Sequence, residues 1–255
     1  MRGLRLRLWQ VGLLLLFLAW WEWASRTGRL DPFFFSQPSE IAGRVWRWFS
    51  TGEIYPHLYI TTLEMLLAFF LGTLLGVVLG LWLALAPSVA AVLDPYIKAL
   101  KAIPRVVLAP IFTLWFGLGV LSKVALGVTL VFFVAFFNTY QGVKEVSPVV
   151  LQNARLLGAR PGHLLRHVYL PSAASWIFSS LRTSIGFAVI GAVVGEYLGS
   201  AAGLGYVIAQ AEGVFDTTGV FAGMVVLMVF VLLLDAVVGQ VEGRLVRWRP
   251  KMEAE

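Results

Sequence analysis

The sequence of 255 residues contains no cysteine, which excludes disulfides, thiolate metal sites and cysteine nucleophiles. Charged residues are also scarce: they make up 13% of the chain, against roughly 25% in soluble domains. Hydrophobic residues account for 59%. A soluble fold of this length would have to expose large apolar patches. The composition therefore indicates an all-α membrane protein, a single bundle of helices in lipid.

Long basic tracts are missing as well, although the net charge is +6. The basic residues instead separate apolar runs, a pattern typical of membrane topology and not of nucleic-acid binding. His163 and His167 are four residues apart and could share a helix face. The sequence has no HExxH motif, and no carboxylate adjoins the pair. We therefore expect a solvated histidine pair, with no metal site and no cofactor.

Six segments have the length and composition of membrane spans, because about 20 apolar residues cross a hydrocarbon core. The first follows a basic start, as in a signal peptide, but it ends in tryptophans without a small-x-small site, so an uncleaved helix is expected. The third is expected to be irregular because Pro104 and Pro110 each remove a backbone donor. The six are residues 8–23, 58–86, 103–118, 121–140, 174–198 and 220–240.

Glycines recur every four residues in the second span, at Gly72, Gly76 and Gly80, and so share one helix face. Small residues on one face let a second helix approach closely in lipid. Packing inside one subunit is the first interpretation, and a seam between two copies is the second.

Six spans place both termini on one side, and the basic residues support this topology. Fourteen fall on the side of the termini and five on the other, while Arg182 lies inside the fifth span. This bias predicts cytoplasmic termini. The fourteen are Arg2, Arg5, Arg7, Lys98, Lys101, Arg105, Lys144, Arg155, Arg160, Arg166, Arg244, Arg247, Arg249 and Lys251; the five are Arg26, Arg29, Arg44, Arg47 and Lys123.

The outer loop, residues 25–56, contains a helical pattern. Ser36 is placed to cap a short helix with Pro38 in its first turn. Ile41, Val45 and Trp48 then lie near one face. This pattern suits a helix in the membrane interface; a plain connector is the alternative.

The stretch 145–172 lies on the cytoplasmic side of the predicted topology and is more polar than the spans around it. Leucines keep a helical pattern, while Gly158 and Pro161-Gly162 break its middle. We expect a short helix, a turn and a second short helix that ends at Leu170-Pro171. Two short helices below a membrane bundle form a docking surface for a partner.

The spacing within this stretch resembles the signature of permease subunits in binding-protein-dependent ABC importers. That signature is Glu-Ala-Ala, three residues, Gly, nine residues, then Ile-x-Leu-Pro. Here Gln152 and Asn153 replace the first Glu and Ala, Val168 replaces Ile conservatively, and the spacing and the other residues match. The residues that the resemblance assigns to this ATPase-coupling loop are Gln152, Asn153, Ala154, Arg155, Gly158, Val168, Leu170 and Pro171.

Further motifs resemble the nitrate/sulfonate/taurine-type branch of these permeases. They are Asp94-Pro95, Ile103-Pro104, Ala109-Pro110, Trp115-Phe116-Gly117, Ser122-Lys123, Phe137-Asn138-Thr139, Gly195-Glu196 and Gly203-Leu204-Gly205. The resemblance implies a type I ABC importer permease fold in the inner membrane. It also implies a second permease copy, most simply a homodimer, together with ABC ATPase subunits and an extracytoplasmic solute-binding protein. The chain has no GxxxxGK[ST] phosphate loop, so ATP hydrolysis is expected on a separate subunit.

Four ionisable residues stand out within the spans, where such groups are costly and functional by default. Glu64 lies near the outer end of the second span, where snorkelling or water would satisfy it; related permeases often have a basic residue there. Arg182 and Asp235 have similar depths, which suggests an ion pair between the fifth and sixth spans; separate contacts with backbone, water or headgroups are the alternative. Glu196 either lines the outer mouth of a pathway or orients the glycine-rich loop that follows it.

The resemblance implies a domain organisation and a function. Residues 1–57 form an N-terminal helix and outer loop, 58–246 a core of five spans that includes the loop 145–172, and 247–255 a cytoplasmic tail. The expected function is ATP-driven import of a small solute, such as a sulfonate, nitrate, taurine or a vitamin precursor. The alternatives are a secondary transporter, for which no internal repeat is evident, and a membrane-embedded enzyme, for which no histidine accompanies the serines at membrane depth.

Overall fold

The structure, a computed structural model, describes residues 2–245, and this range contains helices and no strand. Five helices are long and apolar enough to cross a membrane within the described residues. They are α1 (Arg2–Arg26), α4 (Tyr55–Leu85), α7 (Val120–Lys144), α10 (Leu170–Leu198) and α12 (Thr217–Leu245). The predicted spans at 8–23, 58–86, 121–140, 174–198 and 220–240 are confirmed as helices. The predicted tail, 247–255, lies outside the described residues.

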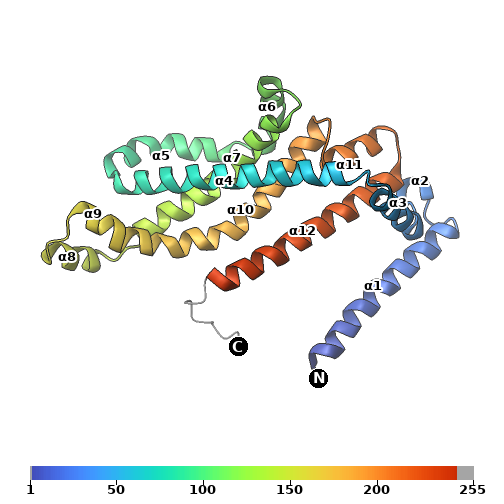
Figure 1. The fold of residues 1–255 in the computed structure, drawn as a ribbon, viewed down its shortest axis with the longest axis horizontal. Helices are drawn as coiled ribbons and strands as arrows, with labels where there is room; N and C mark the ends of the chain where they lie inside the picture. Colours follow the sequence, from blue (N-terminus) through green and yellow to red (C-terminus); the bar gives the residue numbers. More distant parts are fainter. Residues whose placement is uncertain (1, 246–255) are drawn as a thin grey trace.

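Shorter helices connect the long ones. Those that precede α7 in the sequence are α2 (Pro32–Phe35), α3 (Pro38–Thr51), α5 (Pro87–Ala102), a 3₁₀ turn (Arg105–Leu108) and α6 (Ala109–Phe116). They are followed by α8 (Pro148–Leu156), α9 (Pro161–Leu164), a π turn (Leu165–Tyr169) and α11 (Leu204–Gly213). Helices α8 and α9 lie at one end of the molecule, and α3 and α11 lie at the other (Figure 1). We refer to these as the α8 end and the α11 end.

The core consists of α4, α7 and α10, which pack against one another along most of their lengths. Its central cluster joins Met65 and Ala68 of α4, Val131 of α7, and Ala188 and Ala192 of α10. Three of the six buried residues in this cluster are alanines, whose small side chains let the three helices lie close together. The core is therefore held by close helix approach, the main source of packing energy in lipid.

The glycine stripe of α4 explains this close approach. A Cβ atom added at Gly72 would lie 2.7 Å from Cβ of Val131, and one added at Gly76 would lie 2.6 Å from the carbonyl oxygen of Phe132. Both partners belong to α7. The stripe therefore packs inside one chain, as the first interpretation of the sequence held. A second glycine contact joins α7 and α10, where Gly191 meets the backbone of Gly127.

The third predicted span, 103–118, is wrong in its bounds. The structure instead has α5, which follows α4 at the α8 end, and α6, with a bend of 86° between them. Pro104 begins the bend because the residue before a proline avoids the helical region; Ile103 accordingly has extended backbone angles. The bent pair makes a sixth span only when it is counted as one segment.

Arg105 lies inside this bend and not in a peripheral loop. Its guanidinium donates hydrogen bonds to the carbonyl oxygens of Leu100 (2.6 Å) and Ile103 (2.8 Å). It also lies 4.2 Å from the ring centroid of Phe133, near the middle of α7. Because the bend leaves carbonyls without helical partners, Arg105 supplies the donors that irregular backbone needs at this depth.

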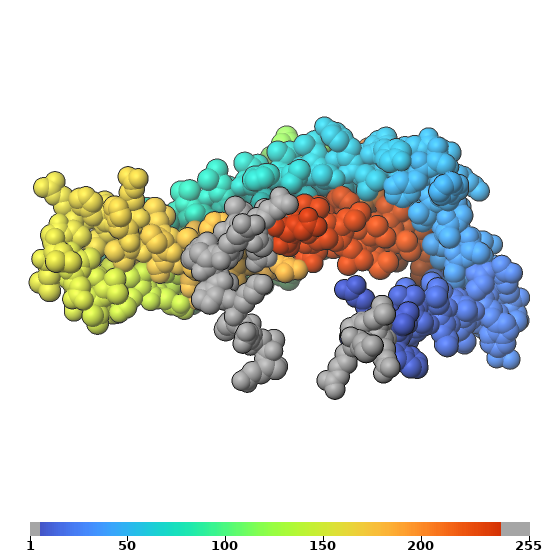
Figure 2. Space-filling view, turned by 60° about the horizontal axis from the view of Figure 1, so that its bottom comes forward, coloured from blue at the N-terminus to red at the C-terminus, as the bar shows by residue number. Residues whose placement is uncertain are grey.

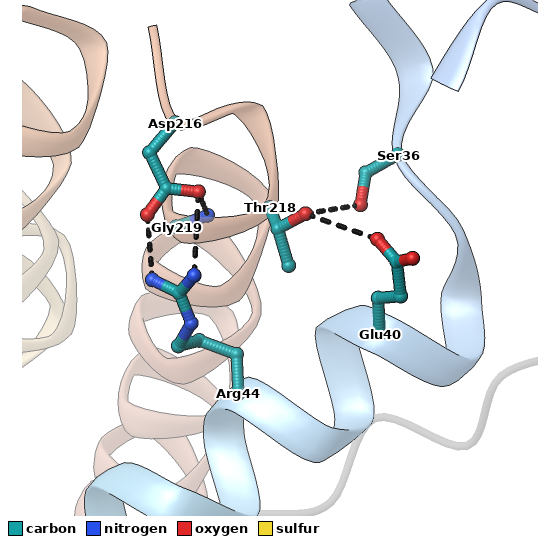
Figure 3. Close-up of polar contacts among 6 residues, drawn as sticks. All are labelled: Ser36, Glu40, Arg44, Asp216, Thr218 and Gly219. Atoms are coloured by element: carbon teal, nitrogen blue, oxygen red, sulfur yellow. Dashed lines mark hydrogen bonds and ion pairs between the residues drawn. The ribbon is translucent and has the colours of Figure 1, made fainter. Parts of the chain in front are cut away.

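The expected helix in the outer loop is present as α3, but its cap differs from the prediction. Its N-cap residue is Gln37, which makes no side-chain cap hydrogen bond. Ser36 instead is buried, and its hydroxyl hydrogen-bonds with that of Thr218 in α12 (Figure 3). The backbone N–H of Ser39 donates to Glu22 of α1, so a carboxylate from another helix caps the first turn of α3.

Helix α1 lies apart from the core, at the same end of the molecule as α3 (Figure 1 and Figure 2). Among the described residues its principal contacts are with α2 and α3. An apolar groove of about 790 Å³ runs between α1, α3 and α12, with Trp21, Ile41 and Met224 in its wall. An apolar groove in this position suits a hydrocarbon environment and not water.

The glycine contact in the core predicts a measurable loss of stability. Gly76→Ala places a methyl group against a backbone carbonyl, which cannot move aside as a flexible side chain would. We expect it to destabilise the fold by about 1–3 kcal/mol. Gly186→Ala is the matched control, because no atom lies within 4 Å of its Cβ position. Thermal unfolding of the purified protein compares the two; equal melting temperatures would contradict the packing argument.

Candidate functional site

The loop 145–172 forms the predicted helix, turn and second helix. Helix α8 ends in a turn where Gly158 has a φ of +83°. The N–H of Gly158 donates to the carbonyl of Arg155 and that of Ala159 to the carbonyl of Ala154. This pair of bonds is a Schellman motif, whose left-handed position favours glycine. The glycine of the predicted signature is therefore required by backbone geometry.

Large apolar side chains on this loop face outward. Leu156 is 85% exposed and Leu157 is 89% exposed, and Val149 and Val150 are also exposed. Gln152, Asn153 and Arg155 are exposed too, while Ala154 is half-buried. Contiguous exposed leucines at the end of a helix indicate a protein interaction surface.

The second helix of the loop does not end at Leu170-Pro171 as predicted. Helix α9, the π turn and α10 form one continuous run. Pro171 has no N–H, and its ring crowds the carbonyl of the residue four positions earlier. The N–H of Leu170 donates to Leu165, five residues back, so the π turn absorbs this conflict. Val168 is half-buried, while Leu170 and Pro171 are exposed.

The loop is fixed to the bundle at two points. Leu164 of α9 is buried, and the hydroxyl of Ser172 donates to the carbonyl of Gly142 in α7. The absence of a Cβ at Gly142 leaves room for Trp176, which would lie 2.9 Å from it. The surface that carries the exposed leucines is therefore attached firmly to α7 and α10.

Arg182 and Asp235 form the ion pair that the sequence suggested. One guanidinium nitrogen of Arg182 lies 2.9 Å from each carboxylate oxygen of Asp235, and a second lies 3.1 Å from one of them. Both side chains are about half exposed on the surface of the isolated chain. Because the pair joins α10 to α12, two otherwise loosely packed helices are connected at this depth.

Glu64 does not snorkel, which corrects the expectation for this residue. Its side chain points into the bundle, where it is 1% exposed and hydrogen-bonded to Glu196 of α10. Its Oε2 atom has no hydrogen-bond partner among the described residues. The sequence indicated neither this meeting nor the third member of the cluster, Lys123 of α7. Lys123 is also buried and donates to the carbonyl oxygens of Leu118 (2.5 Å) and Gly119 (3.2 Å).

Glu196 orients the glycine-rich loop that follows it, one of the two roles considered from the sequence. Three successive backbone N–H groups at the start of α11 donate to side chains of the core. That of Gly203 donates to Nδ1 of His57 (3.1 Å), and that of Leu204 to the hydroxyl of Thr61 (2.9 Å). That of Gly205 donates to Glu196 (2.8 Å), which also accepts from Thr61 (2.6 Å).

Histidines and carboxylates do not assemble a metal centre within the residues that the structure describes. His163 and His167 have ring centroids 6.2 Å apart, and both side chains are exposed. His57, at the α11 end, stacks on Tyr206.

A polar contact at the α11 end was missed from the sequence. Arg44 of α3 donates to Asp216, with a shortest N–O distance of 2.5 Å (Figure 3). Asp216 also accepts from the N–H of Gly219 and so caps α12. Burial opposes ionisation of this carboxyl, but the hydrogen bonds from Gly219 and Arg44 outweigh it and hold the pKa of Asp216 below its ordinary value. The pair ties α3 to the N-terminus of α12.

The fold places the protein in a class. The structure matches one of the "inward facing conformations of the MetNI methionine ABC transporter" with a TM-score of 0.64 at 17% sequence identity, covering 76% of this chain and 94% of the other. The chain thus has the type I ABC importer permease fold. The sequence also matches the family described as "Binding-protein-dependent transport system inner membrane component" over residues 48–247, and the chain belongs to that family.

Two relatives support the predicted branch. The chain is 32% identical over 247 residues to the putative aliphatic sulfonates transport permease protein SsuC of Bacillus subtilis, covering 96% of this chain and 90% of that protein. It is 34% identical over 235 residues to the riboflavin transport system permease protein RibX of Chloroflexus aurantiacus, covering 92% and 88%. The chain is therefore a multi-pass inner-membrane permease of an importer for small solutes and belongs to the nitrate/sulfonate/taurine-type branch.

The Arg182–Asp235 pair predicts rescue by charge exchange. Reversing either charge alone, by Arg182→Asp or Asp235→Arg, leaves like charges facing each other. We expect a loss of about 2–3 kcal/mol in a bilayer, the scale for an unpaired charge at membrane depth. The double reversal should recover most of this stability, measured by thermal unfolding in nanodiscs. A double variant as unstable as the sum of the singles would exclude a direct pair.

The lowered pKa of Asp216 predicts a stability contribution that depends on pH. Because the folded-state pKa lies below the unfolded value of about 4, the charged pair stabilises the protein above pH 4 and loses this effect as the pH falls further. Asp216→Asn retains a capping side chain but not the charge. The melting-temperature difference between wild type and this variant should shrink from pH 6 to pH 3. A constant difference would contradict the pairing with Arg44.

Proposed function

We propose that this chain is the membrane subunit through which an ATP-driven importer moves a small solute, with ATP hydrolysed by a separate subunit. The observation that carries the proposal is the exposed pair Leu156 and Leu157 on a loop anchored to α7 and α10. Such a surface is suited to a partner that covers the leucines and pushes on the core. The spacing around Gly158 supports an ATPase as that partner, because it resembles the family's coupling signature.

The proposal fixes the orientation of the molecule. The α8 end faces the cytoplasm, where the ATPase is present, and both termini lie on that side. Four basic residues in or directly before the loop 145–172, Lys144, Arg155, Arg160 and Arg166, support this orientation. The α11 end, with α3 and its half-buried Trp48, then meets the external solution, where a solute-binding protein docks.

The pathway requires a second permease copy. Transport by alternating access needs a polar route, and the core of one chain is closed by its glycine contacts and apolar clusters. The Arg182–Asp235 pair is half exposed on the single chain, a position that favours a wall shared with a partner copy. We infer a homodimer, with each chain supplying one wall.

The solute is a small anion or a vitamin precursor. Support comes from the relatives named for aliphatic sulfonates and for riboflavin. These solutes share polar or anionic groups attached to a compact organic frame. In such importers the binding protein selects the solute, so the permease offers a route and little selectivity.

Exposed Leu157 provides the test of coupling. Since its side chain touches little of its own chain, Leu157→Ser should leave the melting temperature unchanged. Loss of the apolar contact should reduce co-purification of the ATPase subunit and ATP-dependent uptake in proteoliposomes about 10-fold, an effect of about 1.4 kcal/mol.

The control is Leu157→Met, which keeps an apolar side chain and should retain uptake close to wild type. Omission of the ATPase from the proteoliposomes should abolish uptake in every variant. Full uptake by Leu157→Ser, or uptake driven by an ion gradient without the ATPase, would refute the proposed role and favour a secondary transporter.

A further inference from the structure

Two carboxyl groups meet in the interior at the α11 end. Glu64 of α4 and Glu196 of α10 are each 1% exposed, and their carboxyl groups lie within hydrogen-bonding reach of each other. Two carboxylates cannot form a hydrogen bond with each other, because an ionised carboxyl group only accepts hydrogen bonds. A hydrogen bond between these groups therefore needs a hydrogen that one of the two carries.

The surroundings identify Glu196 as the ionised member. Its two oxygens accept hydrogen bonds from the hydroxyl of Thr61 (2.6 Å) and the N–H of Gly205 (2.8 Å). Gly205 is in the first turn of α11, and a helix N-terminus favours an anion. A Cβ on Gly203 would lie 2.1 Å from the carboxyl carbon of Glu196, so the loop closes directly over this group. The hydrogen is then carried by Glu64.

The remaining charged groups around the pair agree with a single proton. Buried Lys123 of α7 carries one positive charge. Two of its three N–H groups donate hydrogen bonds to the carbonyl oxygens of Leu118 and Gly119. From α4, His57 accepts at Nδ1 and is therefore not doubly protonated. From α11, Glu212 is exposed and bonded to Tyr197 of α10. From α12, Asp216 is paired with Arg44.

A proton on Glu64 makes this buried cluster electrically neutral, because the charges of Lys123 and Glu196 cancel. Without that proton the cluster would carry a net negative charge in an interior with little water, which is strongly unfavourable. The unpartnered Oε2 of Glu64 adds to this, since a neutral acid tolerates a bare oxygen better than a carboxylate does.

We propose that Glu64 and Glu196 form a proton-binding site, and that the bound proton holds the start of α11 against α4 and α10. When the proton leaves, the two carboxylates repel each other across these helices. Glu196 then pulls away from Gly205 and Thr61, and the segment Gly203–Leu204–Gly205 loses its anchor. The site is thus a proton-dependent clasp at the α11 end, at the opposite end of α10 from the loop 145–172.

Infrared spectroscopy of the purified full-length protein tests for the proton. The wild type should show the carbonyl stretch of a buried carboxylic acid at neutral pH, with the small shift on exchange into D₂O that a protonated acid gives. Glu64→Gln keeps the size and a hydrogen-bond donor but has no acid proton, so this band should disappear. The same band in the variant would overturn the proposal.

Thiol labelling tests the clasp, and the absence of native cysteine makes a single introduced thiol unambiguous. Ile208→Cys places the thiol on the buried side of α11. The labelling rate of the Ile208→Cys variant is divided by that of the double variant Ile208→Cys/Glu64→Gln. The division removes the effect of pH on the ionisation of the thiol itself, because both proteins carry the same thiol. This ratio should rise at least 5-fold as the pH is raised from 6 to 10.

Two further results decide the outcome. Glu64→Ala, which cannot bridge to Glu196, should label faster than Glu64→Gln at every pH, while an unfolded variant is recognised by its lost melting transition. A ratio that stays at one across the pH range would show that no titratable proton holds α11, and the proposal would fail even if the chain imports solute as proposed.

Discussion

The structure depends on the close approach of α4, α7 and α10. Lipid tails are as apolar as leucine, so hydrophobic burial gives these helices little reason to associate. Gly72, Gly76 and Gly80 let α4 touch the backbone of α7, and Gly127 meets Gly191 where α7 touches α10. Contact at this range gains dispersion energy along the full length of the helices. It also excludes lipid and water from the polar groups between them.

Acidic side chains cap the N-termini of four helices at the α11 end. Asp31 caps α2, Glu22 caps α3, Glu196 caps α11 and Asp216 caps α12. Each helix start leaves backbone N–H groups without partners, and such groups are costly near lipid. Asp31 and Asp216 directly precede the helices that they cap, whereas Glu22 and Glu196 belong to other helices. The caps therefore also connect α1 to α3 and α10 to α11.

Much of the fold could be predicted from local patterns. Apolar length located five spans, and the four-residue glycine period identified the packed face of α4. The matching depths of Arg182 and Asp235 predicted their pairing, because a charge in lipid needs a partner at its own level. The turn at Gly158 followed from glycine and proline positions. In each case the prediction depended on residue spacing within one segment, or on how deep a residue lies along its membrane span.

Other features could not be predicted, because they depend on which face each helix turns toward its neighbours, and a single sequence does not specify this rotation. Glu64 was expected to reach water or snorkel at the outer end of its span, yet its side chain points inward toward Glu196 and Lys123. The Arg44–Asp216 contact joins residues 172 positions apart, and nothing local marks it. The bend at Pro104 was expected as an irregularity, but its angle depends on how α5 folds back beside α4.

The uninterrupted run from Pro161 to Leu198 has a mechanical consequence. Its 38 residues form a rod of about 57 Å at 1.5 Å per residue. One tip of the rod adjoins the exposed leucines of α8, and the other carries Glu196 and the carboxyl pair. Apart from the π turn near its first tip the run is α-helical, so a tilt of α10 moves the residues next to the exposed leucines together with the carboxyl pair.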